Sequence, residues 1–368
     1  MENLSSKHKK EFEKQIRNIS DNDELKVLKE IDGEIEKLKK IYEKGGSHKI
    51  EGLIENAEFL TKILKDKDFP LPESTKKWIV FGLGYLISDI DLIPDIIPVI
   101  GYNDDALILQ WVMHMIDDDI NRYIMFQKAR NVKEPAEVVK QPVQGSGDTL
   151  VVVVPGFLNE AYDSDYFKHW SKKIRDAGEP FSNAGIAIVD WNIAHLKEFS
   201  KIIRIIDHRL NLKPVYDFEK FNAEWKQLKM EFAFLGKALA VFLENIHKKY
   251  PGKEVIVVSF NAGNFAVETA LKILPEGYVS RYFSFGGAMS NTDMPFFELR
   301  KVNRIYNYFS FNDYALKFIF DNFEEEAQAV GLSPYTNPSA VNVENFNVSE
   351  SISNHFEYKF KLSDFLKI

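Results

Sequence analysis

The sequence predicts an α/β fold, in which a mostly parallel β-sheet carries helices on both faces and an all-helical region precedes it. Two observations support this prediction. After residue 149, short apolar runs alternate with helical segments, which is typical of parallel strands joined by crossover helices. Before residue 68, Leu and Ile recur at three- and four-residue steps among many Lys and Glu residues, as on amphipathic helices.

Composition narrows the class of protein. Of the 368 residues, 45% are hydrophobic and 28% charged, which is ordinary for a globular chain. The net charge is −8 and no basic stripe alternates with aromatic residues, so we expect no nucleic-acid partner. The chain has no cysteine, which excludes disulfides, thiolate metal sites and cysteine nucleophiles. Because the first residues are charged and lack the apolar core of a signal peptide, we expect a cytoplasmic protein, with membrane association left open.

Residues 1–68 are expected to form a charged helical hairpin or coiled-coil region. One apolar stripe runs from Leu28 to Tyr42 and a second from Ile50 to Leu64, with Gly45 and Gly46 between them. An antiparallel helix pair explains this pattern. The alternative is a coiled-coil site for a helical partner within residues 7–67, although each stripe covers only about two heptads.

Residues 69–130 are expected to form a second helical domain. Pro94 and Pro98 exclude one continuous helix, because proline lacks an N–H donor and crowds the preceding turn. The apolar run at 78–87 is about half the length that a bilayer-spanning helix needs. A peripheral membrane contact through residues 78–100 therefore remains open.

One pattern in this domain resembles a known family. The segments "YLIS", "IDLIPD", "IPVIGY" and "DDA", within residues 74–129, resemble the YkvA-like domain, a small bacterial helical module of unknown function. The family's usual proline after the first serine is Asp89 here. The resemblance implies a helical module and no activity.

Residues 131–148 are polar and contain Pro, Gly and Ser, which predicts a linker before a domain at 149–368. A long helical segment is expected at 217–250. Five segments have the composition of buried strands: Thr149–Val154, Ala184–Asp190, Glu254–Phe260, Ser280–Gly286 and Asn303–Phe311.

The stretch "VIVVSFNAGNFAVETAL" (Val255–Leu271) predicts a strand, a sharp turn and a helix. Hydrolases place a nucleophile at the apex of such a turn, with small residues two positions before and after it. Here Ser259 and Gly263 are the small residues, and the apex is Asn261. Asparagine tolerates the positive φ of such an apex better than most residues do.

Other parts of a hydrolase site follow in order along the chain. After the first strand, "PGFLNE" places the backbone N–H groups of Phe157 or Leu158 where they could form an oxyanion hole with that of Ala262. Asp313 follows the last predicted strand and His355 lies near the C-terminus, which is the chain order of acid and histidine in α/β-hydrolases. We expect Gly156, Asn159, Ser259 and Gly263 to border a bound ligand.

These motifs, together with "SFNAG", "FSFNDYALKF", "GLSPY" and "SNHFEY", resemble an α/β-hydrolase-like family that includes eukaryotic transmembrane-and-coiled-coil proteins and bacterial relatives of unassigned substrate. The resemblance covers residues 149–360. It implies an esterase- or lipase-type triad at the positions of Asn261, Asp313 and His355, and an acyl- or lipid-like ligand. Asn261 departs from the family at the nucleophile.

An amide nitrogen is not a useful nucleophile, because its lone pair is delocalised into the carbonyl group, so the serine mechanism is absent. Three hypotheses remain. The chain is a pseudo-hydrolase that binds an acyl- or lipid-like ligand. Alternatively it is an esterase or lipase whose parent form has serine at position 261, or whose Asn261 deamidates to a nucleophilic aspartate. The third is a non-catalytic scaffold that recruits a membrane or a partner.

We expect no metal and no cofactor. The 8 histidines show no HExxH or paired-ligand spacing. No phosphate-binding glycine loop is present either, since "GLGY" at Gly82 lacks the Lys and Ser/Thr of such loops.

Overall fold

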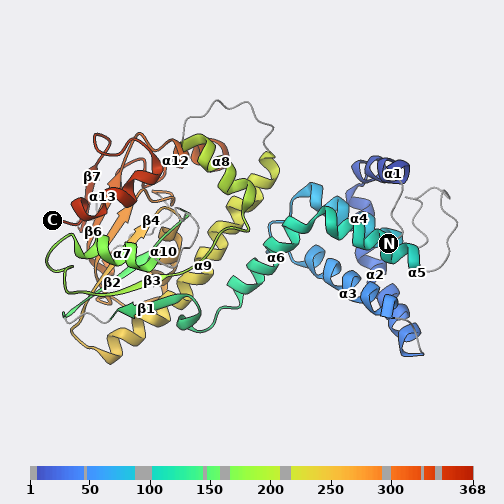
Figure 1. Cartoon of the computed structure of the whole chain (residues 1–368), viewed down its shortest axis with the longest axis horizontal. Coiled ribbons are helices and arrows are strands. Elements are labelled where there is room, and N and C mark those ends of the chain that lie inside the picture. The colour runs from blue at the N-terminus through green and yellow to red at the C-terminus, as the bar shows by residue number, and fades with distance from the viewer. Residues whose placement is uncertain are drawn as a thin grey trace. The chain divides into compact units, whose positions relative to one another are not determined.

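The computed structural model describes residues 6–44, 48–87, 102–143, 147–157, 166–207, 217–291, 300–324, 327–335 and 342–367. They form two compact units, Met1–Met125 and Phe126–Ile368 (Figure 1). The first is helical, and the second contains a seven-stranded, mostly parallel sheet with helices. The predicted fold class is thereby confirmed.

The first unit is a bundle of helices. Its helices are α1 (Ser6–Arg17), α2 (Asp21–Glu43), α3 (His48–Lys65), α4 (Glu73–Leu86), α5 (Tyr102–Met115) and the first part of α6 (Asp117–Arg130). The predicted stripe of α2 is buried, including Ile31, Ile35 and Leu38. Where one helical region was expected before Gly45, the structure has two helices, because Asp23 accepts the N–H of Ser20 at 2.8 Å and begins α2 there.

The sheet of the second unit has the strand order β1-β3-β2-β4-β5-β6-β7. All neighbours are parallel except β1 and β3. The strands are β1 (Val139–Val143), β2 (Thr149–Val154), β3 (Gly185–Val189), β4 (Glu254–Phe260), β5 (Val279–Phe285), β6 (Val302–Phe309) and β7 (Val343–Asn347). The five predicted strands correspond to β2 to β6.

The segment predicted as a linker, 131–148, contains structure that the sequence pattern did not indicate. It holds a short 3₁₀ turn, η1 (Pro135–Glu137), and the edge strand β1. Pro142 lies in β1, and proline is tolerated at a sheet edge because no inner neighbour needs its missing N–H. The sheet therefore begins ten residues before the predicted first strand, at Val139 rather than Thr149.

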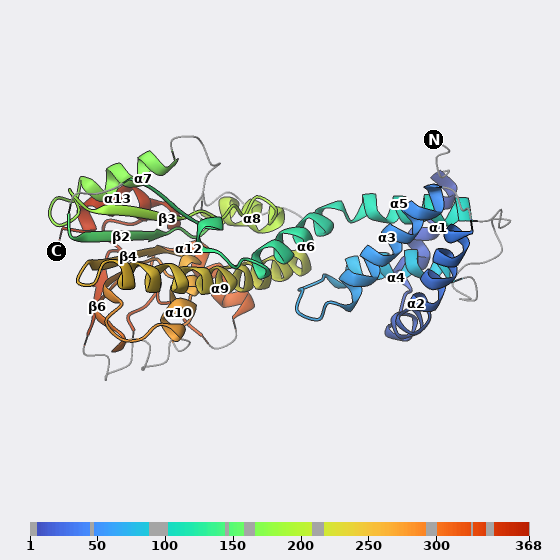
Figure 2. The same cartoon turned by 90° about the horizontal axis from the view of Figure 1, so that it is seen from below.

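Helices cover both faces of the sheet. In Figure 2, α7 and α13 lie on one face, and α9 and α10 on the other. The helices of this unit are α7 (Tyr166–Arg175), α8 (Lys197–Asp207), α9 (Phe218–Lys249), α10 (Gly263–Ile273), α12 (Tyr314–Phe323) and α13 (Tyr358–Phe365), with a 3₁₀ turn, η2 (His355–Glu357), before α13. The long helix predicted at 217–250 is α9.

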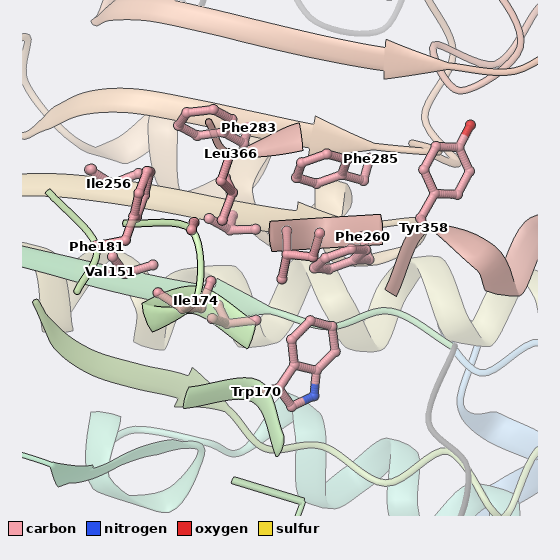
Figure 3. Packing of buried hydrophobic residues seen from close by; sticks show 14 of the residues in the cluster. Val151, Trp170, Ile174, Phe181, Ile256, Phe260, Phe283, Phe285, Tyr358 and Leu366 are labelled. Atoms are coloured by element: carbon pink, nitrogen blue, oxygen red, sulfur yellow. The ribbon is translucent and has the colours of Figure 1, made fainter. Parts of the chain in front are cut away.

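The face under α7 and α13 is a continuous apolar core (Figure 3). Trp170 of α7 packs on Phe260 of β4 with ring centroids 4.8 Å apart, and Phe285 of β5 stacks on Phe260 at 5.2 Å. Burial on both faces explains why β2, β3 and the middle of β4 consist almost entirely of apolar residues, whereas β5 also contains Ser280, Arg281 and Ser284. This core fixes the carboxyl ends of β4 and β6, where the site lies.

Among the described ranges, no helix combines the length and the apolar composition required to traverse a bilayer. Of the segment predicted to contact a membrane, 78–100, the part from residue 88 onward lies outside the described residues.

Candidate functional site

Asn261 is the apex of a tight turn between β4 and α10. Its φ is +55°, and among the described residues it is the one non-glycine residue with positive φ. Its N–H donates to the carbonyl of Phe285 at 3.0 Å, and its carbonyl accepts the N–H of Ala288 at 3.1 Å. These bonds to the end of β5 hold the strained backbone, which is the conformation of a nucleophile elbow.

The side-chain amide of Asn261 is fully buried and bonded at both of its atoms. Oδ1 accepts the N–H of Ala262 at 2.6 Å, and Nδ2 donates to Nε2 of His355. Because the Ala262 N–H requires an acceptor, this network sets which way round the amide lies. The N–H predicted as an oxyanion-hole donor is therefore bonded to Asn261 itself.

His355 connects Asn261 to Asp313. His355 Nδ1 donates to Asp313 Oδ2 at 2.6 Å, and both side chains are fully buried. The proton therefore lies on Nδ1, which leaves Nε2 as the acceptor for the Asn261 amide. The structure brings these three residues together in one hydrogen-bonded chain. In the sequence, Asp313 lies 42 positions and Asn261 lies 94 positions before His355.

Asp313 is held by the helix that it begins. It is the N-cap of α12, and its Oδ1 accepts the N–H of Leu316 at 3.0 Å. The carboxylate thus uses one oxygen for the helix terminus and the other for His355. A side-chain oxygen acceptor at this position satisfies one of the N–H groups that have no partner within the helix.

The loop that carries His355 is fixed to the loop that carries Asp313. Ser310 Oγ donates to the carbonyl of Ile352 at 3.0 Å, and Asn312 Nδ2 donates to that of Ser349 at 2.8 Å. Asn354 caps η2 by accepting the N–H of Phe356 at 3.1 Å. The sequence motifs "SFND" and "SNHF" are therefore partners in space, which their order along the chain alone did not indicate.

Gly156 and Gly263, which were predicted to border a ligand, allow the loop after β2 to approach the turn. A Cβ atom on Gly156 would lie 2.5 Å from the carbonyl oxygen of Phe260 and 2.7 Å from the nitrogen of Ala262. A Cβ atom on Gly263 would lie 2.2 Å from the carbonyl oxygen of Val154. Only glycine fits at these two close approaches. The backbone at Gly156 therefore lies directly beside Asn261, where an oxyanion-hole loop belongs.

Phe157 has a role that the sequence did not reveal. Its ring stacks on His355 with centroids 4.9 Å apart and an interplanar angle of 19°, and its edge meets Phe199 at 4.9 Å. This packing fixes the imidazole plane. The other two predicted residues of this loop, Leu158 and Asn159, lie outside the described residues.

Ser259 faces away from Asn261. Its hydroxyl donates to Asn264 Oδ1 at 2.8 Å and bonds the hydroxyl of Tyr282 at 2.8 Å, while Asn264 Nδ2 donates to Ser284 at 2.6 Å. Burial raises the pKa of the Tyr282 hydroxyl well above its ordinary value. This closed network joins β4 to β5 and α10 behind the turn, and the place of Ser259 at the border of a ligand stays a prediction.

Aromatic rings extend from His355 to the surface. Phe199 joins Phe157 to Phe221, whose centroid is 5.3 Å away, and Phe221 packs on Phe323 at 4.8 Å. Phe323 contacts Phe218, which is 48% exposed. We call these residues the aromatic row: Phe157, Phe199, Phe218, Phe221 and Phe323. The row places apolar side chains of α8, α9 and α12 next to the imidazole.

Asp313, His355 and Asn261 form one hydrogen-bonded chain with an amide at the apex of the turn. Asp313 orients His355, and His355 Nε2 points at the side chain of the elbow residue. An amide offers His355 no hydroxyl proton to remove. Within the described ranges, no three His, Asp or Glu side chains gather in a metal-binding arrangement.

Comparison with known families gives two matches. Residues 221–368 match a family described as "Protein of unknown function (DUF726)", and residues 75–111 match one described as "Protein of unknown function (DUF1232)". The first match contains Asn261, Asp313 and His355. The second lies within the segment that resembles the YkvA-like domain. No curated protein and no solved structure matches the chain.

Proposed function

We propose that this protein is a pseudo-hydrolase of esterase or lipase type, which binds an acyl- or lipid-like ligand at Asn261 without covalent catalysis. The observation that carries the proposal is the Asn261–His355–Asp313 chain, which keeps the acid, the histidine and the strained turn but has an amide at the apex. Loss of the nucleophile in a serine hydrolase lowers turnover on the order of 10⁶-fold.

The amide supports binding because it has both a donor and an acceptor. A ligand carbonyl or carboxylate that enters the site can take the Ala262 N–H from Oδ1, while Nδ2 remains bonded to His355. The exchange leaves Oδ1 without its partner, and a buried acceptor without a hydrogen bond costs about 1–3 kcal/mol, which the bonds of the ligand have to exceed. The aromatic row beside His355 is apolar, but Phe157, Phe199 and Phe221 are buried against one another, so an acyl chain has to displace their rings to reach the site.

The first experiment measures hydrolysis of nitrophenyl esters with short to long acyl chains. We expect no activity above background for the unaltered chain. We expect Asn261→Ser to gain esterase activity, since serine at the same apex would have its proton acceptor in place. Asn261→Ser with His355→Ala should lose that gain. Activity of the unaltered chain that depends on His355 would contradict the proposal. Peptide mass would then show whether Asn261 has deamidated to aspartate.

The second experiment measures binding of a long-chain fatty acid by calorimetry. Phe199→Ala should weaken binding, because Phe199 joins the aromatic row. Phe242→Ala is the matched control, since Phe242 is an equally buried phenylalanine of α9 outside the row. A folded chain that binds no fatty acid, together with a silent Asn261→Ser, would favour the alternative of a non-catalytic scaffold that recruits a membrane or a partner.

A further inference from the structure

Two helices beside the site form a basic face on an acidic chain. Helices α7 and α13 pack against each other on the same side of the sheet (Figure 2). Their outer surface carries Lys172 and Lys173 from α7, and Lys359 and Lys361 from α13, around Phe360, whose side chain is 63% exposed. We call these five residues the α7/α13 face. The whole chain has a net charge of −8, so this is a local reversal of sign.

Lys173 lies near the ring of Phe360 and near two other lysines of the face, Lys172 and Lys359. Lys173 Nζ is 5.4 Å from the centroid of the Phe360 ring, and Lys359 Nζ is 5.9 Å from that of Trp170. Partial burial lowers the pKa of Lys173, and the positive charges of Lys359 and Lys172 lower it further, while Asp176 acts in the opposite direction. The positive charges therefore repel one another here, and this repulsion destabilises the chain when no partner is bound.

Asp176 offsets the repulsion at Lys173 in part, without pairing with it. In the described ranges, none of the four lysines forms an ion pair with Asp or Glu, although Lys367 nearby pairs with Asp364 at 3.5 Å. An external anionic surface would relieve the repulsion between them. A partner of this face therefore has to carry negative charge for the lysines and an apolar environment for the ring of Phe360.

We propose that the α7/α13 face docks on the surface of an anionic phospholipid bilayer. Lysines on flexible stems attract anionic headgroups at long range, and an exposed phenylalanine between them has the apolar side chain that inserts at the boundary of headgroups and acyl chains. The exposed ring of Phe360 gains free energy by leaving water for lipid.

The face adjoins the candidate site along the chain, although α7 itself carries no residue of the site. Helix α7 is the first helix after the loop of Phe157, and α13 continues directly from the 3₁₀ turn that begins at His355. Docking would therefore bring the site's two flanking elements to a lipid surface. The proposal goes beyond ligand binding at Asn261, because docking requires nothing in the site.

The test is cosedimentation of the full chain with vesicles of equal parts phosphatidylcholine and phosphatidylserine. We expect binding to these vesicles, none to vesicles of phosphatidylcholine alone, and loss of binding at high salt, because the screening length falls from about 10 Å at 0.1 M to about 3 Å at 1 M. Each of Lys359→Gln and Lys361→Gln should weaken binding roughly fivefold, and the double variant should weaken it by at least about tenfold. Phe360→Ser should weaken binding while its salt dependence persists.

A matched control keeps the result specific to this face. Lys248→Gln with Lys249→Gln removes the same charge from the exposed end of α9, and should leave binding unchanged. The proposal is overturned if the full chain does not bind the mixed vesicles, or binds phosphatidylcholine alone equally well. Equal loss in the two double variants would overturn it too. Circular dichroism of each variant shows that it is folded.

Discussion

The side chain of Asn261 and its backbone impose opposite demands on position 261. The backbone, with φ at +55°, favours glycine, whereas the buried bonds to His355 and Ala262 need an amide. Asparagine meets both, because it enters the left-handed region more readily than other residues with side chains of its size. Alanine would carry the conformational strain without either bond.

Substitution of Asn261 by glycine and by alanine separates the two demands. Both variants lose the bonds to His355 and Ala262, but only alanine retains the cost of a Cβ atom at positive φ. We expect Asn261→Gly to be more stable than Asn261→Ala by about 1 kcal/mol in the free energy of unfolding. Denaturant unfolding measures this difference. Equal stabilities would show that the turn relaxes to negative φ when the amide is removed.

Residue types could be predicted for this site, but their contacts could not. The turn around Asn261 has a local signature, and the order of Asp313 and His355 agrees with the resemblance to hydrolases. Stacking of Phe157 on His355, and the bonds that make Ser259 a support of the turn, depend on which strands are neighbours. That information is absent from local sequence pattern. The ligand-binding roles assigned to these residues stay predictions.

At the scale of elements, strands were predictable where both faces are buried. The strands β2 and β4 contain the apolar runs Leu150–Val154 and Val255–Val258, and they were found with their observed bounds. The strands at the two sheet edges were missed. Pro142 interrupts β1, and β7 ("VENFN") leaves Glu344, Asn345 and Asn347 exposed, so neither shows the composition of a buried strand.

Helices α9 and α10 meet at a position where their backbones nearly touch. A Cβ atom on Gly236 of α9 would lie 2.5 Å from the carbonyl oxygen of Ala266 and 2.6 Å from the Cβ of Thr269, both in α10. Alanine is the better helix former by about 1 kcal/mol, so propensity and packing oppose each other here. The turn of Asn261 leads directly into α10, which makes this contact a support of the site.

We expect Gly236→Ala to destabilise the chain by about 1–3 kcal/mol, because packing outweighs propensity where backbone atoms would have to move. Gly33→Ala in α2 is the matched control. Nothing lies within 4 Å of a Cβ atom built on Gly33, so the same substitution should stabilise its helix by about 0.5–1 kcal/mol. Scanning calorimetry gives both values. The same sign for both substitutions would contradict the packing argument.

At the scale of the whole molecule, the chain consists of two units with separate cores, and the division falls within α6. The first unit depends on a buried polar group that α6 supplies. Arg122 donates to Asp119 at 2.7 Å and to the carbonyl of Pro70 at 3.2 Å, and Thr75 donates to Asp119 at 2.5 Å. Arg122 and Asp119 are almost fully buried. Removing one member of such a pair costs about 3–5 kcal/mol.

This network predicts where the chain can be divided. A fragment of residues 1–130 retains all of α6 and should fold, with one cooperative thermal transition at the temperature of that unit in the full chain. A fragment of residues 1–116 lacks Asp119 and Arg122, leaves Thr75 and the carbonyl of Pro70 without these partners, and should not give a cooperative transition. Circular dichroism during heating compares the two fragments. Cooperative unfolding of 1–116 would show that the bundle of α1 to α5 is sufficient, and that the Arg122–Asp119 pair contributes little to its stability.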